Sequence, residues 1–124
     1  MDMSRAVGNE NFDKMKSYVS DVVSKLDVDA GNTRVGVLTY SNKQRTIVHL
    51  NEHETAAALQ TTIDSLPYEE HRKANTHTAL RYVRRKMLIE KEGDRPYVPN
   101  VVVVLTGGQS TLQTKVQVGS TVVH

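Results

Sequence analysis

Apolar side chains near the start of the chain recur at intervals of three and four residues, which is the spacing of one face of an amphipathic helix. Asn11 suits the N-cap of this helix, and Asp13 suits its first turn, where a negative charge interacts favourably with the helix dipole. The apolar stripe consists of Phe12, Met15, Val19, Val22, Val23 and Leu26.

The same spacing predicts two further helices. One spans residues 54–66 and is ended by Pro67, whose ring cannot continue a helix. The other follows a polar loop and opens at Thr76 or Thr78. Their apolar stripes are Ala56, Leu59, Ile63 and Leu66 in the first, and Leu80, Val83 and Met87 in the second.

Short segments rich in β-branched residues predict strands. Residues 33–40 and 45–50 are two of them, and the short polar turn between them favours an antiparallel hairpin. Residues 100–106 (NVVVVLT) are apolar almost throughout, which is typical of a strand buried on both faces of a parallel sheet. Residues 109–124 suggest one or two more short strands.

The order helix, strand, strand, helix, helix, strand predicts an α/β fold, with an open, mostly parallel sheet flanked by helices. The 124 residues are enough for one domain. Ligands of such folds bind beyond the carboxyl ends of the strands. The loops to search for chemistry are therefore residues 2–8, 41–44, 74–78 and 106–110.

Composition narrows the class of protein. Apolar residues make up 38% and charged residues 24% of the chain, which is typical of a globular domain. The 16 basic and 14 acidic residues nearly balance, and the resulting formal net charge of +2 is too small to indicate nucleic-acid binding. Without cysteine there is no disulfide, thiolate zinc site or cysteine nucleophile. No segment is long and apolar enough to span a membrane, and residues 1–16 are too polar for a signal peptide.

One basic cluster interrupts this even distribution of charge. Its four residues are Arg81, Arg84, Arg85 and Lys86, and at helical spacing they cover part of an exposed face. Such a cluster is either an ordinary solvated face or a patch that binds a polyanion. The sequence leaves both interpretations open.

The motifs of enzymes and nucleotide-binding proteins are missing. TGGQS follows the last predicted strand but lacks the lysine of the Walker pattern. His77 lies beside two threonines, yet no G-x-S-x-G elbow supplies a nucleophile for it. The chain is therefore predicted not to be an enzyme. No zinc motif is formed by His49, His53 and His71.

Four stretches resemble the motifs of a von Willebrand factor A-type domain, in the order and spacing of that family across residues 2–111. DMSRAVGNENF is similar to its DxSxS loop and the helix that follows, and GNTRVGVLTYSN to its second strand. NTHTALRYV is similar to its threonine loop, and NVVVVLTGGQS to its fourth-strand loop. The resemblance implies a three-layer, Rossmann-like fold of the extracellular matrix type, as in collagen VI-like and matrilin-like domains.

The resemblance also implies a metal-ion-dependent adhesion site, where a divalent ion such as Mg²⁺ is shared with a carboxylate of the ligand. Asp2, Ser4 and Thr76 match the metal-binding residues of the family. Ala6 stands in place of the second serine and Gly107 in place of an aspartate, so the site is degenerate and lacks one of two acidic charges. The alternative is that Asp2 and Ser4 cap the first helix and that Thr76 caps the third.

The function that this implies is a non-enzymatic protein-binding or adhesion module of a secreted extracellular matrix protein. Its expected partner is a matrix protein such as collagen, with no nucleic acid and no membrane insertion. A metal-free structural interaction domain and a non-functional truncated fragment stay open as alternatives.

The same resemblance raises a question about the sheet. The central first strand of the family precedes the DxSxS loop and is not encoded in these 124 residues. After Ser110, too few residues follow for the family's next helix and strand. We therefore expect residues 1–124 to form a single, incomplete domain. Neighbouring strands or another segment must then close the gap, since exposed strand edges promote aggregation.

Overall fold

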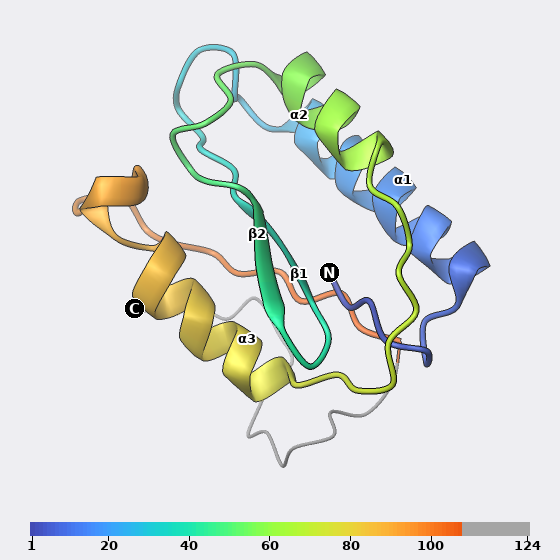
Figure 1. Ribbon diagram of the computed structural model, residues 1–124. Coiled ribbons are helices and arrows are strands. Elements are labelled where there is room, and N and C mark those ends of the chain that lie inside the picture. Colours follow the sequence, from blue (N-terminus) through green and yellow to red (C-terminus); the bar gives the residue numbers. More distant parts are fainter. Residues whose placement is uncertain (108–124) are drawn as a thin grey trace.

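The computed structural model describes residues 1–107, which form three layers (Figure 1). Helices α1 (Asn9–Lys25) and α2 (Ala56–Asp64) lie side by side against one face of a central hairpin, and α3 (Thr76–Tyr82) lies against the other face. The helical layers flank strands, as the α/β prediction requires. The strands suggested within residues 109–124 lie outside the described residues.

The hairpin is formed by β1 (Val37–Tyr40) and β2 (Gln44–Val48), which pair antiparallel. Its tight end brings Tyr40 opposite Gln44, so residues 41–43 form the turn. The predicted hairpin is confirmed, although β1 begins four residues later than the sequence pattern indicated.

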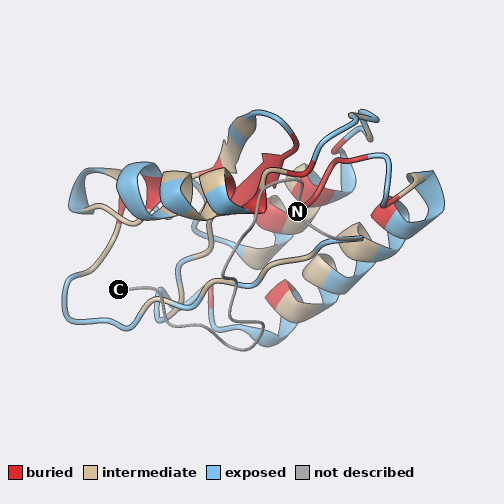
Figure 2. Cartoon of the chain, turned by 90° about the horizontal axis from the view of Figure 1, so that it is seen from below, coloured by how far each residue is buried: buried red, intermediate tan, exposed pale blue. Residues whose placement is uncertain are grey.

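Two apolar clusters, one on each face of the hairpin, form the core, because successive side chains of a strand point to opposite faces. Val37 packs with α1 and α2, whereas Leu38 packs with α3. Buried residues accordingly concentrate where the hairpin meets the helices (Figure 2). The larger cluster contains Phe12, Val23, Val48, Leu59 and Ile63, and the smaller contains Tyr40, Ala74, Ala79 and Met87.

Helix α1 begins two residues before the predicted N-cap, so the assignment of Asn11 as the cap is wrong. Gly8 is the N-cap, with a φ of 75° that a residue with a side chain rarely adopts. Its carbonyl accepts the first helical hydrogen bond, from the Phe12 N–H at 3.0 Å. Because glycine turns the chain here, Phe12 enters the core with its side chain fully buried.

The third helix changes its pitch after Tyr82. It opens at Thr76, as predicted, and continues from α3 into a π-helical turn, η1 (Val83–Met87). A short 3₁₀ turn, η2 (Glu90–Glu92), follows. None of the helices within residues 1–107 combines the length and apolar character needed to cross a bilayer.

The predicted open, mostly parallel sheet is not found within residues 1–107, where the parallel pairing consists of two isolated bridges, Asp2 with Tyr40 and Ser4 with His71. Residues 1–3 make the first of these. They run parallel to the end of β1, with the Met3 N–H bonded to the Tyr40 carbonyl at 2.8 Å and the Tyr40 N–H to the Met1 carbonyl at 3.0 Å. On their other side, the Asp2 N–H bonds to the Leu105 carbonyl at 2.9 Å. These residues therefore lie between the hairpin and the segment that follows residue 100.

The valine-rich segment is the main departure from the predicted sheet. Residues 100–106 do not form a strand: Val102 makes an isolated bridge, and Val101 and Val103 are each 62% exposed rather than buried. A cavity of about 530 Å³ lies alongside, lined by Val37 and Leu38 of β1 as well as by these valines. Within residues 1–107, the backbone pairing with residues 1–3 is at Leu105, and no described strand lies beside Val101 and Val103.

The packing of Phe12 gives a first test of this core. Its ring is fully buried and lies 5.3 Å from the ring of Tyr68. We expect Phe12→Leu to lower the free energy of unfolding by about 1 kcal/mol, and Phe12→Ala by about 3–5 kcal/mol because it leaves a cavity. Urea unfolding followed by circular dichroism measures both values. Tyr18→Ala is the control, since Tyr18 is 53% exposed, and an equal loss there would contradict the assigned core.

The α-amino group of Met1 predicts a dependence of stability on pH. It donates to the Leu38 carbonyl at 2.8 Å, and burial lowers its pKa from 8.0 to about 5, against the opposing effect of the Asp2 charge. Between these values the unfolded amine binds a proton that the folded amine does not. Stability should therefore be complete above pH 8 and fall towards pH 5, by at most about 1.4 kcal/mol per pH unit.

This prediction applies to a chain that starts at Met1, and thermal unfolding between pH 5 and 8 measures it. Nα-acetylation removes the titrating amine, and the cavity beside Met1 has room for the acetyl group. An acetylated chain with the same pH dependence would show that other groups cause it.

Candidate functional site

The candidate site lies where the turn at residues 2–4, the start of α3 and residues 106–107 meet at the end of β1. At its centre is the fully buried carboxylate of Asp2. One oxygen, Oδ1, accepts the Ser4 N–H at 2.7 Å. The other, Oδ2, accepts the Thr106 hydroxyl at 2.8 Å and the Gly107 N–H at 3.3 Å. Both oxygens are therefore held by donors of the protein itself.

Ser4 shares the turn with Asp2 but keeps its hydroxyl free. The side chain is 2% exposed, and within the described residues its Oγ has no hydrogen-bond partner. The backbone is fixed instead, because the Ser4 carbonyl accepts the Tyr68 hydroxyl at 2.8 Å. An unpartnered buried hydroxyl is uncommon, and its oxygen is available to bind a further group beside the carboxylate.

Thr76 is joined to the site through a residue that the sequence analysis missed. Its hydroxyl donates to the hydroxyl of Tyr40 at 3.2 Å, and both residues are buried. Burial raises the pKa of Tyr40, and the Asp2 charge adds to this, while hydrogen bonds with Thr76 and Thr106 act in the opposite direction. The Tyr40 hydroxyl therefore lies near residues of three of the four predicted loops, Asp2, Thr76 and Thr106.

The alternative that these residues cap helices is wrong. Helix α1 begins at Asn9 with Gly8 as its N-cap and no side-chain cap, since the carboxylate of Asp2 is turned to Ser4 and Thr106. Helix α3 likewise has no side-chain cap, and the hydroxyl of Thr76, its first residue, is bonded to Tyr40.

The two positions that depart from the family pattern differ in their surroundings. Ala6 is exposed and brings no oxygen. A Cβ on Gly107 would lie 2.7 Å from the Cα of Val7, closer than real side chains approach a backbone atom. An aspartate at position 107 would therefore require the loop at residues 4–8 to move.

As arranged, these residues do not fit a resident divalent ion. Mg²⁺ prefers about six oxygen ligands and is usually held by one or two carboxylates. Here there is one carboxylate, with both oxygens bonded, and the free donor is the Ser4 hydroxyl. No cluster of three or more His, Cys, Asp or Glu that could hold a metal ion is found within residues 1–107. The assignment of Asp2, Ser4 and Thr76 as ligands of Mg²⁺ thus stays a prediction.

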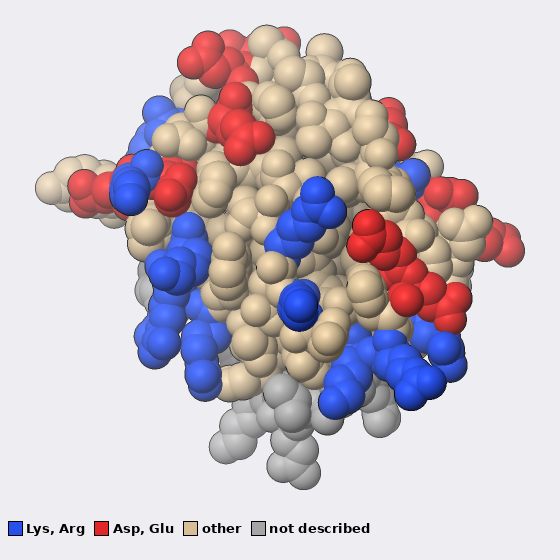
Figure 3. All heavy atoms as spheres, viewed as in Figure 1, with Lys and Arg blue, Asp and Glu red and all other residues tan. Residues whose placement is uncertain are grey.

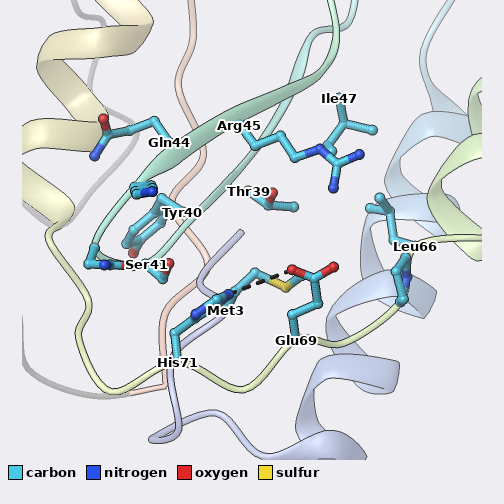
Figure 4. A pocket seen from close by; sticks show the side chains of 13 residues that line it. Met3, Thr39, Tyr40, Ser41, Gln44, Arg45, Ile47, Leu66, Glu69 and His71 are labelled. Carbon is cyan, nitrogen blue, oxygen red and sulfur yellow. Dashed lines mark hydrogen bonds and ion pairs between the residues drawn. The ribbon is translucent and has the colours of Figure 1, made fainter.

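A second cavity, of about 320 Å³, adjoins the site (Figure 4). Met3 lies at its base, Arg45 and Ile47 line the hairpin side, and Glu69 and His71 line the opposite side. His71 Nε2 is 3.7 Å from Glu69 Oε2, whereas no hydrogen bond or ion pair holds Arg45 within the described residues. The cavity thus combines an apolar base with an unpaired cation at its rim.

His77 is not placed to act as a general base. It is exposed, and its Nε2 lies 2.9 Å from the guanidinium of Arg81. Arginine can only donate, so this nitrogen is the acceptor. The free hydroxyl of Ser4 has no contact with it, and the two therefore form no nucleophile and base pair.

The fold and the DxS turn define a known class of domain. The family model of the von Willebrand factor type A domain matches residues 1–122, and the chain belongs to this family. The similarity therefore covers the hairpin, the three helices and the site together.

Curated relatives include proteins of three kinds. Von Willebrand factor A domain-containing protein 2 of Mus musculus is 35% identical over 87% of this chain, and Matrilin-4 of Homo sapiens is 35% identical over 89%. The collagen alpha-4(VI) chain of Mus musculus is 34% identical over 90% of it. The chain spans only 14%, 18% and 5% of these proteins, respectively.

Among solved structures, proximal thread matrix protein 1 from the mussel byssus has a similar fold. One structure of it superposes with a TM-score of 0.84 at 23% identity, covering 92% of this chain and 30% of that one. A second, described as having a zinc-occupied MIDAS motif, superposes with a TM-score of 0.71 at 22% identity over 78% of this chain and 26% of that one. At this identity the likeness shows the fold alone.

The hydrogen bonds of Asp2 give a test of the site that needs no ligand. Asp2→Ala would leave the Ser4 N–H, the Thr106 hydroxyl and the Gly107 N–H without their acceptor. We expect the free energy of unfolding to fall by about 3 kcal/mol, because hydrogen bonds to a buried charge are among the strongest. Asp13→Ala is the matched control, since that carboxylate is 63% exposed and its ion pair contributes about 0–1 kcal/mol. Urea unfolding should separate the two variants, and equal losses would show that Asp2 does not hold the site together.

Proposed function

We propose that this chain is a non-catalytic protein-binding module of an extracellular matrix protein, and that its degenerate adhesion site works without a resident metal ion. The bonding of Asp2 carries this proposal. Because protein donors hold both carboxylate oxygens, and because Ala6 and Gly107 contribute no ligand, the site is complete in itself. The matrilin and collagen relatives support the extracellular setting.

The binding surface that we assign is the end of the sheet where the candidate site opens into the cavity of about 320 Å³. A concave surface with an apolar base and a few polar groups is typical of binding sites. Met3 and Ile47 provide the apolar part, and Arg45 provides a cation for an acidic or carbonyl group of the partner. A matrix protein such as collagen is the partner we expect.

A metal-assisted adhesion site is the second candidate, and the unpartnered hydroxyl of Ser4 is the observation that favours it. A divalent ion would use this oxygen and would draw Thr76 away from Tyr40 and Asp2 away from Thr106. The two candidates therefore differ in the role of Ser4, since its hydroxyl binds a metal ion only in the second.

Binding to immobilised fibrillar collagen, measured by surface plasmon resonance in Mg²⁺ and in EDTA, tests the proposal. We expect equal affinity in both buffers, equal affinity for Ser4→Ala, and a loss of about tenfold for Arg45→Ala, because its charge-assisted hydrogen bond is removed. Calorimetric titration with Mg²⁺ and Mn²⁺ should give no heat and no thermal shift at millimolar metal.

Each result has a clear meaning. Binding that is lost in EDTA and in Ser4→Ala, together with heat on metal addition, would overturn the metal-free proposal in favour of the second candidate. Absence of binding to collagen in either buffer would overturn the choice of partner. Lys14→Ala is the control for Arg45→Ala, since Lys14 is exposed on α1 and pairs with Glu10 at 3.5 Å.

A further inference from the structure

A group of unpaired cations covers the outer face of α3 and η1. We call it the α3 basic patch and define it as Arg81, Arg84, Arg85 and Lys86, all of which are exposed. Within the described residues, the side chains of Arg84, Arg85 and Lys86 make no ion pair or hydrogen bond, and that of Arg81 bonds to His77. The patch therefore keeps its full charge available to a ligand.

The cations on the opposite layer are arranged differently. On α1, Lys14 pairs with Glu10 at 3.5 Å, and Lys25 pairs with Asp21 at 3.0 Å. By contrast, residues 71–89 contain six Lys and Arg and no Asp or Glu. In the space-filling view, Lys and Arg gather at the left edge, over α3 and the turn that follows it (Figure 3). The formal net charge of +2 for the whole chain thus conceals a strongly uneven distribution.

The π-helical turn places three consecutive cations on the surface. In an α-helix, successive residues are about 100° apart, so three in a row seldom share one face. Here the Leu88 N–H bonds to the Val83 carbonyl at 2.9 Å, an i to i+5 bond that widens the turn. Within this turn, Arg84, Arg85 and Lys86 are exposed while Met87 is buried.

The patch is also held rigidly in place. Met87 packs with Leu38 and Ala79 in the smaller core cluster. Tyr82 lies between Arg81 and Arg84 in the sequence. Its hydroxyl accepts a hydrogen bond from the Thr46 hydroxyl of β2 at 3.2 Å. A fixed backbone lowers the entropic cost of binding. Arg84, Arg85 and Lys86 lie in the last turn, where cations interact favourably with the helix C-terminus, and their charged groups are still exposed to a ligand.

We propose that the α3 basic patch binds a sulfated polysaccharide. Guanidinium groups bind the oxygens of sulfate and phosphate bidentately, and a linear polyanion can engage several cations in a row. Duplex nucleic acid is less suited, because the chain as a whole lacks the large positive field that such proteins have. The choice of sulfated sugar over an anionic membrane rests on the extracellular setting of the proposed function.

Binding of the full chain to a size-defined heparin oligosaccharide, measured by calorimetry at about 0.1 M salt, tests this proposal. We expect Arg84→Gln/Arg85→Gln to lower the affinity about tenfold and to reduce the salt dependence of binding. The matched control is Lys14→Gln/Lys25→Gln, which removes the same charge from the exposed, acid-paired lysines of α1 and should change the affinity less than about twofold. Because all four side chains are exposed, thermal unfolding should show that both variants stay folded.

Three results would overturn the proposal: no heparin binding, equal losses in both double variants, or equally effective competition by duplex DNA of the same total charge. The first would show that the patch is a solvated surface, the second that only net charge matters, and the third that the patch does not select sulfated sugar. Collagen binding is measured separately and should be unchanged in Arg84→Gln/Arg85→Gln, so failure of this proposal can be told from failure of the proposed function.

Discussion

The hydrogen bonds around the Asp2 carboxylate hold together parts of the chain that are far apart in sequence. Asp2 is fully buried and bonds to Ser4 in its own turn and to Thr106 and Gly107 near the far end of the described chain. A buried carboxylate without such donors would be very unfavourable, so the segments must stay close. The candidate site and the approach of residues 106–107 to the turn at residues 2–4 depend on this one group, whereas backbone hydrogen bonds hold residues 1–3 beside β1.

The same bonds are the observation behind the proposal that the site works without a resident metal ion. In a metal site, the carboxylate and hydroxyls of these loops would surround an ion, whereas here they are bonded to one another and to Tyr40. Under this proposal, glycine at position 107 leaves the site with one acidic charge fewer to favour a dication, and Thr76 bonds to the Tyr40 hydroxyl. Membership of the von Willebrand factor type A domain family is therefore compatible with binding through side chains alone.

The two faces of the molecule differ in how their charges are used. On α1, lysines are paired with acidic residues one turn away, while the cations of the α3 basic patch make no ion pair within the described residues. The candidate site and this patch lie on different surfaces of the segment formed by α3 and η1, since Thr76 of α3 is buried and Arg84 of η1 is exposed. One continuous helical segment thus supports two separate surfaces, because the side chain of Thr76 is buried while those of Arg84, Arg85 and Lys86 are exposed.

The sequence by itself determined the three helices, the hairpin and the loops of the site, because apolar spacing and turn residues act over short distances. The family motifs named Asp2, Ser4 and Thr76 but gave no reason to include Tyr40, whose role depends on a 3.2 Å contact between residues 36 positions apart. The run of valines predicted a buried strand, yet Val101 and Val103 are exposed, and no local pattern determines which distant segment lies beside such a run. Only the tertiary structure decided these points, since long-range hydrogen bonding and strand pairing depend on how distant segments meet.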